Sequence, residues 1–332
     1  MKAKTEGGVR DIKAVWFEEG RVIMIDQRKL PRQLEFVSFD NYRDVAESIS
    51  NMTTRGAPSI GATAAYGMCL AALKGDDIEK AAAFIKAARP TAYDLFYAVD
   101  HMADALRGGA DPVEAADAYA QTIIDKCLAI GRHGEPLIKD GAKVMTHCNA
   151  GALATVDVGT ALAPMRAAHE KGKRFFVYVS ETRPRLQGMQ LTSWELLQED
   201  IDHAIIPDGA SGHFLRDGVD LVILGADRIA ANGDFANKIG TFEKAVLAKE
   251  LGVPFYVAAP ISTFDFSTRR GEDIKIEYRS QEEITVVSGV RIAPEGARAL
   301  NPSFDMTPAK YVTGFITERG ILKPNEIRKV LG

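Results

Sequence analysis

The chain has 332 residues, of which 46% are hydrophobic and 26% charged, so it has the composition of a soluble globular protein long enough for two domains. Its 41 basic and 45 acidic residues give a net charge of -4 without a block of like charge, so no nucleic-acid partner or anionic membrane is expected. The three widely spaced cysteines fit neither a disulfide framework nor a zinc knuckle, and favour a reducing, cytoplasmic compartment. The first residues lack the apolar core of a signal peptide, and no apolar run is long enough to span a membrane.

Residues 14–40 contain short apolar runs separated by turn residues, which predicts a small antiparallel sheet. From residue 42 to about 129 the pattern becomes helical, with Ala-rich amphipathic stretches punctuated by Gly and Pro. The expected helices cover 58–73, 77–88, 93–107 and 112–129. We therefore expect residues 1–130 to form a smaller, mostly helical N-terminal domain that carries the small sheet.

A break at Gly131-Arg132-His133-Gly134 is followed by short apolar runs that alternate with helical stretches. The runs are nearly continuous rather than alternating, which indicates strands buried on both faces of a parallel sheet. Residues 131–332 are therefore predicted to form a doubly wound, Rossmann-like α/β catalytic domain, with its site at the carboxyl ends of the strands. The helices expected here cover 153–170, 192–199, 210–216, 238–251 and 307–319.

Several familiar site motifs are absent. The sequence has no G-x-G-x-x-G after a strand, no G-x-x-x-x-G-K-[ST], no G-x-S-x-G and no H-E-x-x-H. Nicotinamide enzymes, P-loop ATPases, α/β-hydrolases and zincins are thereby disfavoured, and we expect neither a cofactor nor a metal.

Polar or reactive residues follow four of the predicted strands: Cys148, the run Ser180 to Arg183, Asp208 and Asp227. Because the carboxyl ends of parallel strands lie at one edge of a sheet, these residues are expected to line one crevice there. Backbone N–H groups and a following helix would favour the thiolate of Cys148, although a buried, inert cysteine is an alternative. Burial would raise the pKa of Asp227 and let it donate a proton, although a turn or capping role is an alternative.

Three segments are candidates for binding an anion. Arg55-Gly56-Ala57-Pro58 combines a guanidinium with free N–H groups before a helix, and Arg89 precedes another helix. Asn237-Lys238 is expected to open a helix that faces an anionic substrate. A solvated surface role is the alternative for each isolated arginine.

Long strings of this sequence resemble methylthioribose-1-phosphate isomerases. They are TRGAPSIGATAAYG (54–67), ARPTA (88–92), THCNAGALAT (146–155), SETRPRLQGMQLTSWEL (180–196), GADRIAANGDFANKIGT (225–241), PFYVAAPISTFD (254–265) and NPSFDMTPAKYVTGFITERG (301–320). That family shares a superfamily with regulatory subunits of translation initiation factor 2B and with ribose-1,5-bisphosphate isomerases.

The resemblance implies a homodimeric enzyme of methionine salvage that turns the aldose 5-methylthioribose 1-phosphate into the ketose 5-methylthioribulose 1-phosphate. Its catalytic pair would be Cys148 and Asp227. Its implied contacts with the sugar phosphate are Arg55, Gly56, Ala57, Arg89, Gln187, Asn237 and Lys238.

Three segments depart from the family pattern: Tyr93-Asp94, Val156-Asp157 and residues 208–213. They bear on recognition of the 5-substituent, because a pocket for a methylthio group is expected to be apolar. A 5-deoxyribose 1-phosphate isomerase is therefore one alternative. A ribose-1,5-bisphosphate isomerase is another, which would need a second phosphate site near Arg183 and Arg185. A non-catalytic regulatory subunit is the third, although it would not need Cys148 and Asp227.

Overall fold

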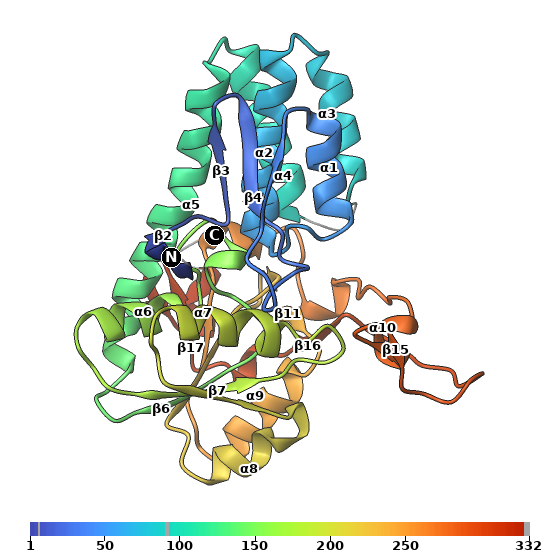
Figure 1. Ribbon diagram of the computed structural model, residues 1–332. Coiled ribbons are helices and arrows are strands. Elements are labelled where there is room, and N and C mark those ends of the chain that lie inside the picture. The colour runs from blue at the N-terminus through green and yellow to red at the C-terminus, as the bar shows by residue number, and fades with distance from the viewer. Residues whose placement is uncertain (6, 90–92, 329–332) are drawn as a thin grey trace.

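The computed structural model describes residues 1–5, 7–89 and 93–328. A mostly helical part stands on an α/β part that is built around the main sheet (Figure 1). Elements of the first part are β1 (Lys2–Thr5), β2 (Gly8–Asp11), β3 (Val15–Glu18), β4 (Arg21–Ile25), β5 (Phe36–Phe39), α1 (Tyr42–Ser50), α2 (Ala57–Leu73), α3 (Ile78–Ala87), α4 (Tyr93–Arg107) and α5 (Pro112–Gly134). The predicted antiparallel sheet is confirmed as β3-β4-β5.

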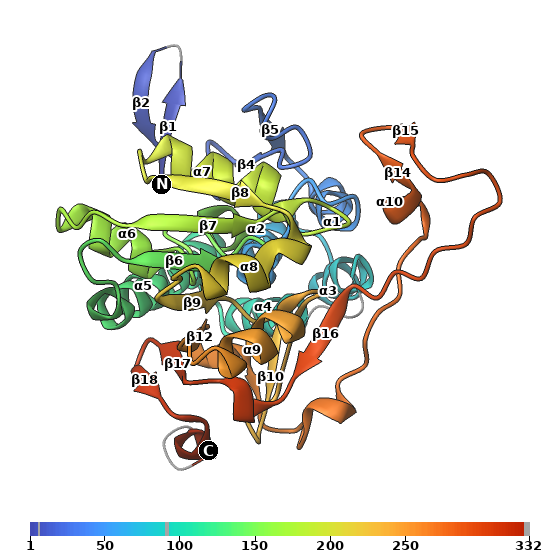
Figure 2. The same ribbon diagram turned by 90° about the horizontal axis from the view of Figure 1, so that it is seen from below.

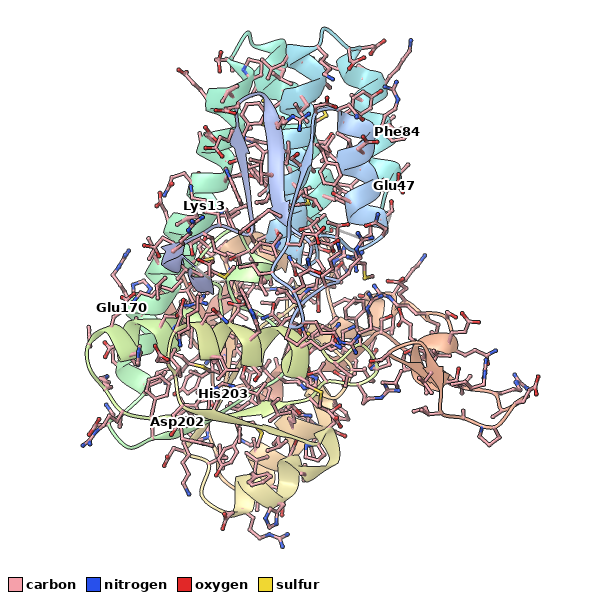
Figure 3. All side chains as sticks on the ribbon, viewed as in Figure 1. Lys13, Glu47, Phe84, Glu170, Asp202 and His203 are labelled. Carbon is pink, nitrogen blue, oxygen red and sulfur yellow. The ribbon has the colours of Figure 1, made fainter. Side chains whose placement is uncertain are left out.

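Helix α2 is the centre of the helical part. Nearly all its side chains are buried, because it packs against α1, α3, α4 and α5 as well as strand β3. Its many Ala and Gly residues allow this close approach on every side. On the outer surface of the same part, Glu47 of α1 and Phe84 of α3 point away from the core (Figure 3).

The main sheet of the α/β part is parallel except at one edge, in the order β18-β17-β12-β9-β6-β7-β8. Its strands are β6 (Lys143–Thr146), β7 (Phe176–Ser180), β8 (His203–Ile206), β9 (Leu221–Leu224), β12 (Phe255–Ala258), β17 (Gly314–Thr317) and the antiparallel β18 (Gly320–Leu322). Neighbouring residues Val144 and Met145 of β6 enter separate cores on the two faces. The prediction of a doubly wound sheet buried on both sides is confirmed.

Helices cover both faces of this sheet, as Figure 2 shows from below. Helices α6 (Ala163–Glu170) and α7 (Ser193–Gln198) belong to one face, and α8 (Ser211–Arg216) and α9 (Thr241–Glu250) to the other. A second, four-stranded sheet has the order β13 (Phe264–Asp265), β10 (Arg228–Ala230), β11 (Phe235–Lys238) and β16 (Phe304–Thr307). The remaining elements, α10 (Glu282–Thr285), β14 (Val286–Val287) and β15 (Val290–Arg291), form an arm that projects from the body (Figures 1 and 2).

Several predicted element boundaries were wrong. Helix α5 continues through the expected break at Gly131 and ends at Gly134, because the bare glycine faces pack against α6. The helix expected over 307–319 is replaced by the last residue of β16, a 3-10 turn at Ala309–Tyr311 and strand β17, because the strand segments satisfy their backbone groups by pairing. The helix expected over 153–170 is formed only from Ala163, and the one expected at 238–251 only from Thr241.

The two parts have separate cores but touch through the chain's first residues. The main core of the helical part ends with Ile124, apart from one contribution by Val156, and a core of the sheet begins with Ile130. Met1 and Ala3 pack on Leu191 and Trp194 of the α/β part. We propose that the domain boundary lies near residue 130, inside α5. No helix among the described residues combines the length and the apolar character of a membrane span.

Candidate active site

A cleft opens at the carboxyl ends of the main sheet, where the helical part meets it. It is lined by every residue that the resemblance implies, namely Cys148, Asp227, Arg55, Gly56, Ala57, Arg89, Gln187, Asn237 and Lys238. Residues far apart in the sequence are thus brought to one place. Arg89 is the last described residue before 90–92, so the rest of the ARPTA string lies outside the described residues.

The topology of the sheet explains why the proposed catalytic pair meets here. From β6 the chain continues to β7 and β8 on one side, and then to β9, β12 and β17 on the other. This reversal between neighbouring strands leaves a crevice above β6 and β9. Cys148 lies two residues after the end of β6, and Asp227 three after the end of β9.

Cys148 is held in an unusual backbone conformation. Its φ of 62° lies in the left-handed region, which non-glycine residues rarely adopt. Its N–H donates to Thr182 Oγ1 at 2.9 Å, and its carbonyl accepts from Thr192 Oγ1 at 2.6 Å. Two threonines that follow β7 therefore fix the direction of the thiol. Strain held in place by such bonds is a feature of functional positions.

The surroundings of Cys148 favour the thiol rather than the thiolate. Burial raises the pKa of this group, and the positive charges of Arg55 and Lys238 oppose that effect only in part. The expectation of thiolate character was wrong because the effect of burial exceeds that of the two cations. Only a short 3-10 turn at Ala152–Ala154 follows the cysteine.

Asp227 behaves as predicted. Burial among protein atoms raises its pKa, while the charges of Lys238, Arg89 and Arg55 act against the rise. Its side chain is exposed and lines the cleft, and its carboxyl has no hydrogen bond to another described residue. Its own N–H donates to Ala236 O at 2.9 Å, which ties the residue to β11. The carboxyl is thus free to meet a substrate.

The start of α2 forms one wall of the cleft. Gly56, its N-cap, has a φ of 93°, and a Cβ there would lie 2.5 Å from the backbone of Ala154. Only glycine fits this close approach. The N–H of Ala57 has no helical acceptor, so the wall offers a donor as well as the positive end of a helix dipole.

Lys238 and Asn237 were predicted to lie at the start of a helix, and this prediction was wrong. They lie on strand β11, because this segment pairs with β10 and β16. Lys238 Nζ donates to Ser303 O at 2.7 Å and lies 4.4 Å from the centre of the Phe304 ring. Burial lowers its pKa, and the nearby Cys148 and Asp227 oppose this. Asn237 Nδ2 donates to Thr241 Oγ1 at 2.9 Å.

Gln187 and Arg89 complete the predicted set. Gln187 Oε1 is buried and has no hydrogen-bond partner among the described residues, which fits an atom that awaits a ligand. Burial lowers the pKa of the Arg89 guanidinium, and the charge of Arg279 acts in the same direction. Several cations thus share one poorly solvated cleft, an arrangement suited to a dianionic group.

Among the charged lining residues, sequence reasoning missed Arg279, whereas Asn149 belongs to the strand-end run 146–149 that was expected at the site. Arg279 follows no predicted strand, and its neighbours carry no pattern that places it near the cleft. Arg185 also lines the cleft, but Arg185 and Arg279 are already paired with Glu283 at 3.0 Å and Glu277 at 3.3 Å. Arg183 is not among the described lining residues and donates instead to the carbonyls of Pro184 and Ile284. Among the described residues no group of three His, Cys, Asp or Glu is placed to hold a metal ion.

Comparisons with known proteins agree with this geometry. Residues 53–324 match the Initiation factor 2 subunit family. Over 327 residues the chain is 49% identical to the methylthioribose-1-phosphate isomerase of Aquifex aeolicus (strain VF5), covering 98% of this chain and 72% of that relative. The chain belongs to the methylthioribose-1-phosphate isomerase branch of this family.

Two solved structures show how widely the fold of this isomerase branch is shared. The 5-methylthioribose 1-phosphate isomerase of Pyrococcus horikoshii OT3 superimposes with a TM-score of 0.88 at 40% identity, over 96% of this chain and 94% of that one. The translation initiation factor eIF-2B subunit delta from A. fulgidus also gives 0.88, at 39% identity, over 97% and 99%. The fold alone therefore does not separate an isomerase from a subunit of a translation initiation factor, so the distinction must come from the side chains of the cleft.

Proposed function

We propose that this protein is an aldose-to-ketose isomerase of methionine salvage, which converts 5-methylthioribose 1-phosphate into 5-methylthioribulose 1-phosphate. The observation that carries the proposal is the convergence of Cys148 and Asp227 with the cations Arg55, Arg89 and Lys238 in one cleft. The relatives in its branch support it, since they are isomerases of this substrate by name.

The chemistry starts with ring opening. A ribose 1-phosphate is a cyclic acetal that cannot open to an aldehyde by itself. Asp227, whose pKa is raised by burial among protein atoms, is the acid that gives its proton to the ring oxygen as the bond from that oxygen to C1 breaks. The hydrogen of C2 then moves to C1, and the C2 hydroxyl loses its proton and becomes the ketone. That proton restores Asp227, so that substrate and product have the same atoms.

Two ways of moving the C2 hydrogen place different demands on Cys148. In a hydride shift the hydrogen carries its electron pair from C2 to the electron-poor C1, and the thiol only shapes the site. In a proton transfer the thiolate removes the hydrogen, and an enolate is protonated at C1. The raised pKa of Cys148 favours the hydride shift.

The phosphate on C1 is held by those cations of the cleft that form no ion pair with a described acidic residue. We assign this role to Arg55, Lys238 and the backbone of Gly56 and Ala57, with Gln187, Asn237 and Arg89 as further contacts. Loss of any one donor is expected to weaken binding without changing the reaction.

The regulatory subunit remains a second candidate because of the similarity to the A. fulgidus initiation-factor subunit. A protein with that role alone would not need a strained cysteine opposite a carboxyl with a raised pKa. For the 5-substituent, 5-deoxyribose 1-phosphate is the alternative substrate.

We further propose that the enzyme works in the cytoplasm, which its three free cysteines support. We also propose that it is a homodimer, as the family resemblance implies, and light scattering would test this oligomeric state.

The test is ketose formation from 5-methylthioribose 1-phosphate by the purified protein, beside Cys148→Ala and Asp227→Asn. Asp227→Asn is expected to lose at least about a hundredfold in kcat, because the ring oxygen loses its proton donor, and Cys148→Ala is also expected to lose activity. Cys69→Ala, which removes a buried thiol outside the cleft, serves as the matched control and keeps its activity. A folded wild-type protein that turns over no sugar 1-phosphate would return the assignment to the regulatory role.

A solvent-label experiment separates the two routes of hydrogen transfer. In heavy water a hydride shift leaves C1 of the product without deuterium, whereas an enolate takes its new hydrogen from the solvent. Deuterium at C1 would rule out the hydride shift and require Cys148 to act as a base.

A further inference from the structure

Asp208 follows a strand of the main sheet, as the sequence predicts, but it has no role in the proposed reaction. It is half-buried, and no residue of 208–213 is among the described residues that line the cleft. The carboxyl of Asp208 is therefore not placed to touch the sugar. Any effect on the reaction must pass through the residues that this carboxyl binds.

Cys148, Thr182 and Asp208 occupy equivalent positions on three neighbouring strands. Each residue lies two positions after the end of its strand, which is β6, β7 and β8 respectively. These strands pair in parallel and in this order, so their carboxyl ends lie at the same edge of the sheet. The three residues therefore form a row along that edge, with Asp208 on the outermost strand, β8.

Hydrogen bonds join the row from one end to the other. Asp208 Oδ1 accepts from the N–H of Thr182 at 2.9 Å, and Oδ2 accepts from the N–H of Arg183 at 2.7 Å. Thr182 Oγ1 in turn accepts from the N–H of Cys148 at 2.9 Å. The carboxylate is thus connected to the cysteine through a single residue.

The hydroxyl of Thr182 is oriented to accept from Cys148. Its oxygen lies 2.9 Å from Ser180 O, to which it donates, and 3.4 Å from His147 Nδ1, the more distant alternative acceptor. Either bond uses the single proton of the hydroxyl and leaves a lone pair for the N–H of Cys148. Thr182 is also fully buried, so this contact is shielded from solvent.

Asp208 holds Thr182 in a backbone conformation that this residue type rarely adopts. The φ of Thr182 is 69°, in the left-handed region that β-branched residues avoid. Asp208 Oδ1 also accepts from Ser180 Oγ at 2.8 Å, so the carboxylate binds the chain on both sides of this conformation. Cys148, with a φ of 62°, has the same kind of strained backbone. One hydrogen bond therefore links two strained residues, and the carboxylate anchors one of them.

We propose that Asp208 is a positioning residue for the reaction, which fixes Thr182 and through it the backbone of Cys148, so that the thiol is held in the cleft. This inference rests on the proposed isomerase function, because that function gives Cys148 its role. The position of the thiol matters in both routes of hydrogen transfer, since the sulfur either removes the C2 hydrogen or shapes the space around it.

The experiment is a double-mutant cycle on the kcat for 5-methylthioribose 1-phosphate. Asp208→Asn keeps the shape of the side chain but cannot accept on both of its terminal atoms, and Thr182→Val removes the acceptor for Cys148. Each variant is expected to lower kcat about tenfold, with KM within about threefold, because neither residue is among those that line the cleft. Since both changes break the same connection, the double variant is also expected to lose about tenfold, whereas independent effects would multiply to about a hundredfold.

Asp234→Asn is the matched control for the carboxylate. Like Asp208, Asp234 is half-buried, and it is not among the residues that line the cleft. It also accepts three hydrogen bonds, from Asn232 Nδ2 at 2.7 Å, Gly271 N at 3.1 Å and Ala309 N at 2.9 Å. The control is expected to lose stability in urea and to keep its kcat.

Thr182→Ser is the conservative variant, which keeps the accepting hydroxyl and is expected to retain kcat within about threefold. The comparison of Thr182→Val with Thr182→Ser leaves the carboxylate untouched, so it tests the connection even if Asp208→Asn does not fold.

Three results would overturn the positioning role and leave the isomerase function standing. They are an unchanged kcat in Asp208→Asn or Thr182→Val, losses that multiply in the double variant, and an equal loss of kcat in Asp234→Asn. If the wild type turns over no sugar 1-phosphate, both proposals are overturned.

Discussion

Arg55 donates two hydrogen bonds to Asn149, from Nη1 to Oδ1 at 3.0 Å and from Nη2 to the backbone O at 2.8 Å. This pair joins the loop before α2 to the loop after β6, directly beside Cys148. The two parts of the chain are thereby locked together at the proposed catalytic residue.

The first prediction concerns Arg55→Lys, which keeps the charge but cannot form the planar double contact. Loss of one hydrogen bond to a charged group costs about 1.5–3 kcal/mol, so kcat/KM is expected to fall roughly 10- to 100-fold. Steady-state kinetics measure the effect. Arg28→Lys is the control, because Arg28 makes a similar double contact with Asp26 away from the cleft. Equal losses in both variants would contradict the role given to Arg55.

A second prediction concerns Glu195, a buried carboxylate that holds the same loop from behind. It accepts from Asn149 Nδ2 at 2.8 Å, Ala152 N at 2.8 Å and Arg166 Nη2 at 2.8 Å. Glu195→Gln removes the charge from a buried pair and is expected to cost about 3 kcal/mol of unfolding free energy, measured by urea denaturation. It is also expected to lower kcat, because the loop that carries Cys148 loosens.

Glu199→Gln is the matched control for this change. Glu199 binds the same Arg166, with Oε2 2.7 Å from Nε, but no hydrogen bond joins it to the loop after Cys148 among the described residues. The control is expected to lose stability and keep its kcat. A similar loss of kcat in both variants would mean that Glu195 acts only through the stability of the fold.

The third prediction concerns pH. Asp227 must carry a proton to open the ring, and burial raises its pKa. The kcat/KM of the wild type is therefore expected to fall as the pH rises through that raised pKa, and Asp227→Asn is expected to lose this dependence along with most of its activity. A wild-type profile that only rises with pH would instead indicate that the Cys148 thiolate limits the reaction.

The fourth prediction concerns stability and Asp94, whose pKa burial raises to about 7. In the unfolded chain this carboxyl titrates near 3.9, so between about pH 4 and 7 the folded state holds more protons and stability falls as the pH rises. Asp94→Asn removes this loss. It is expected to stabilise the protein by up to about 4 kcal/mol at pH 8 and by little at pH 4. Equal effects of the substitution on unfolding at both pH values would show that Asp94 titrates normally.

Much of the architecture was predictable because burial leaves a direct trace in the sequence. The run LVIL of β9 is apolar throughout, as a strand covered on both faces requires, and Asp227 follows it. The strand GFIT of β17 was missed because so short a run has no period of its own and is defined by pairing with β12.

The cleft could be predicted only where the chemistry of a residue stands beside a strand end or a helix start. Cys148, Asp227 and Arg55 meet that condition. Arg279 does not, because only the tertiary path of the chain brings it to the cleft. The protonation of Cys148 was predicted in the wrong direction, since burial depends on neighbours that the local sequence does not contain.

The glycines at the end of α5 have a mechanical consequence. A Cβ on Gly131 would lie 3.1 Å from Ala163 O, and one on Gly134 would lie 2.5 Å from Pro164 Cγ. The last turn of α5 therefore packs directly on the start of α6, and the helix forms a rigid connection between the helical part and the main sheet. A bend of α5 at Gly131 or Gly134 would break its close contact with α6. We therefore expect the loops of the cleft, and not α5, to move when sugars of different size bind.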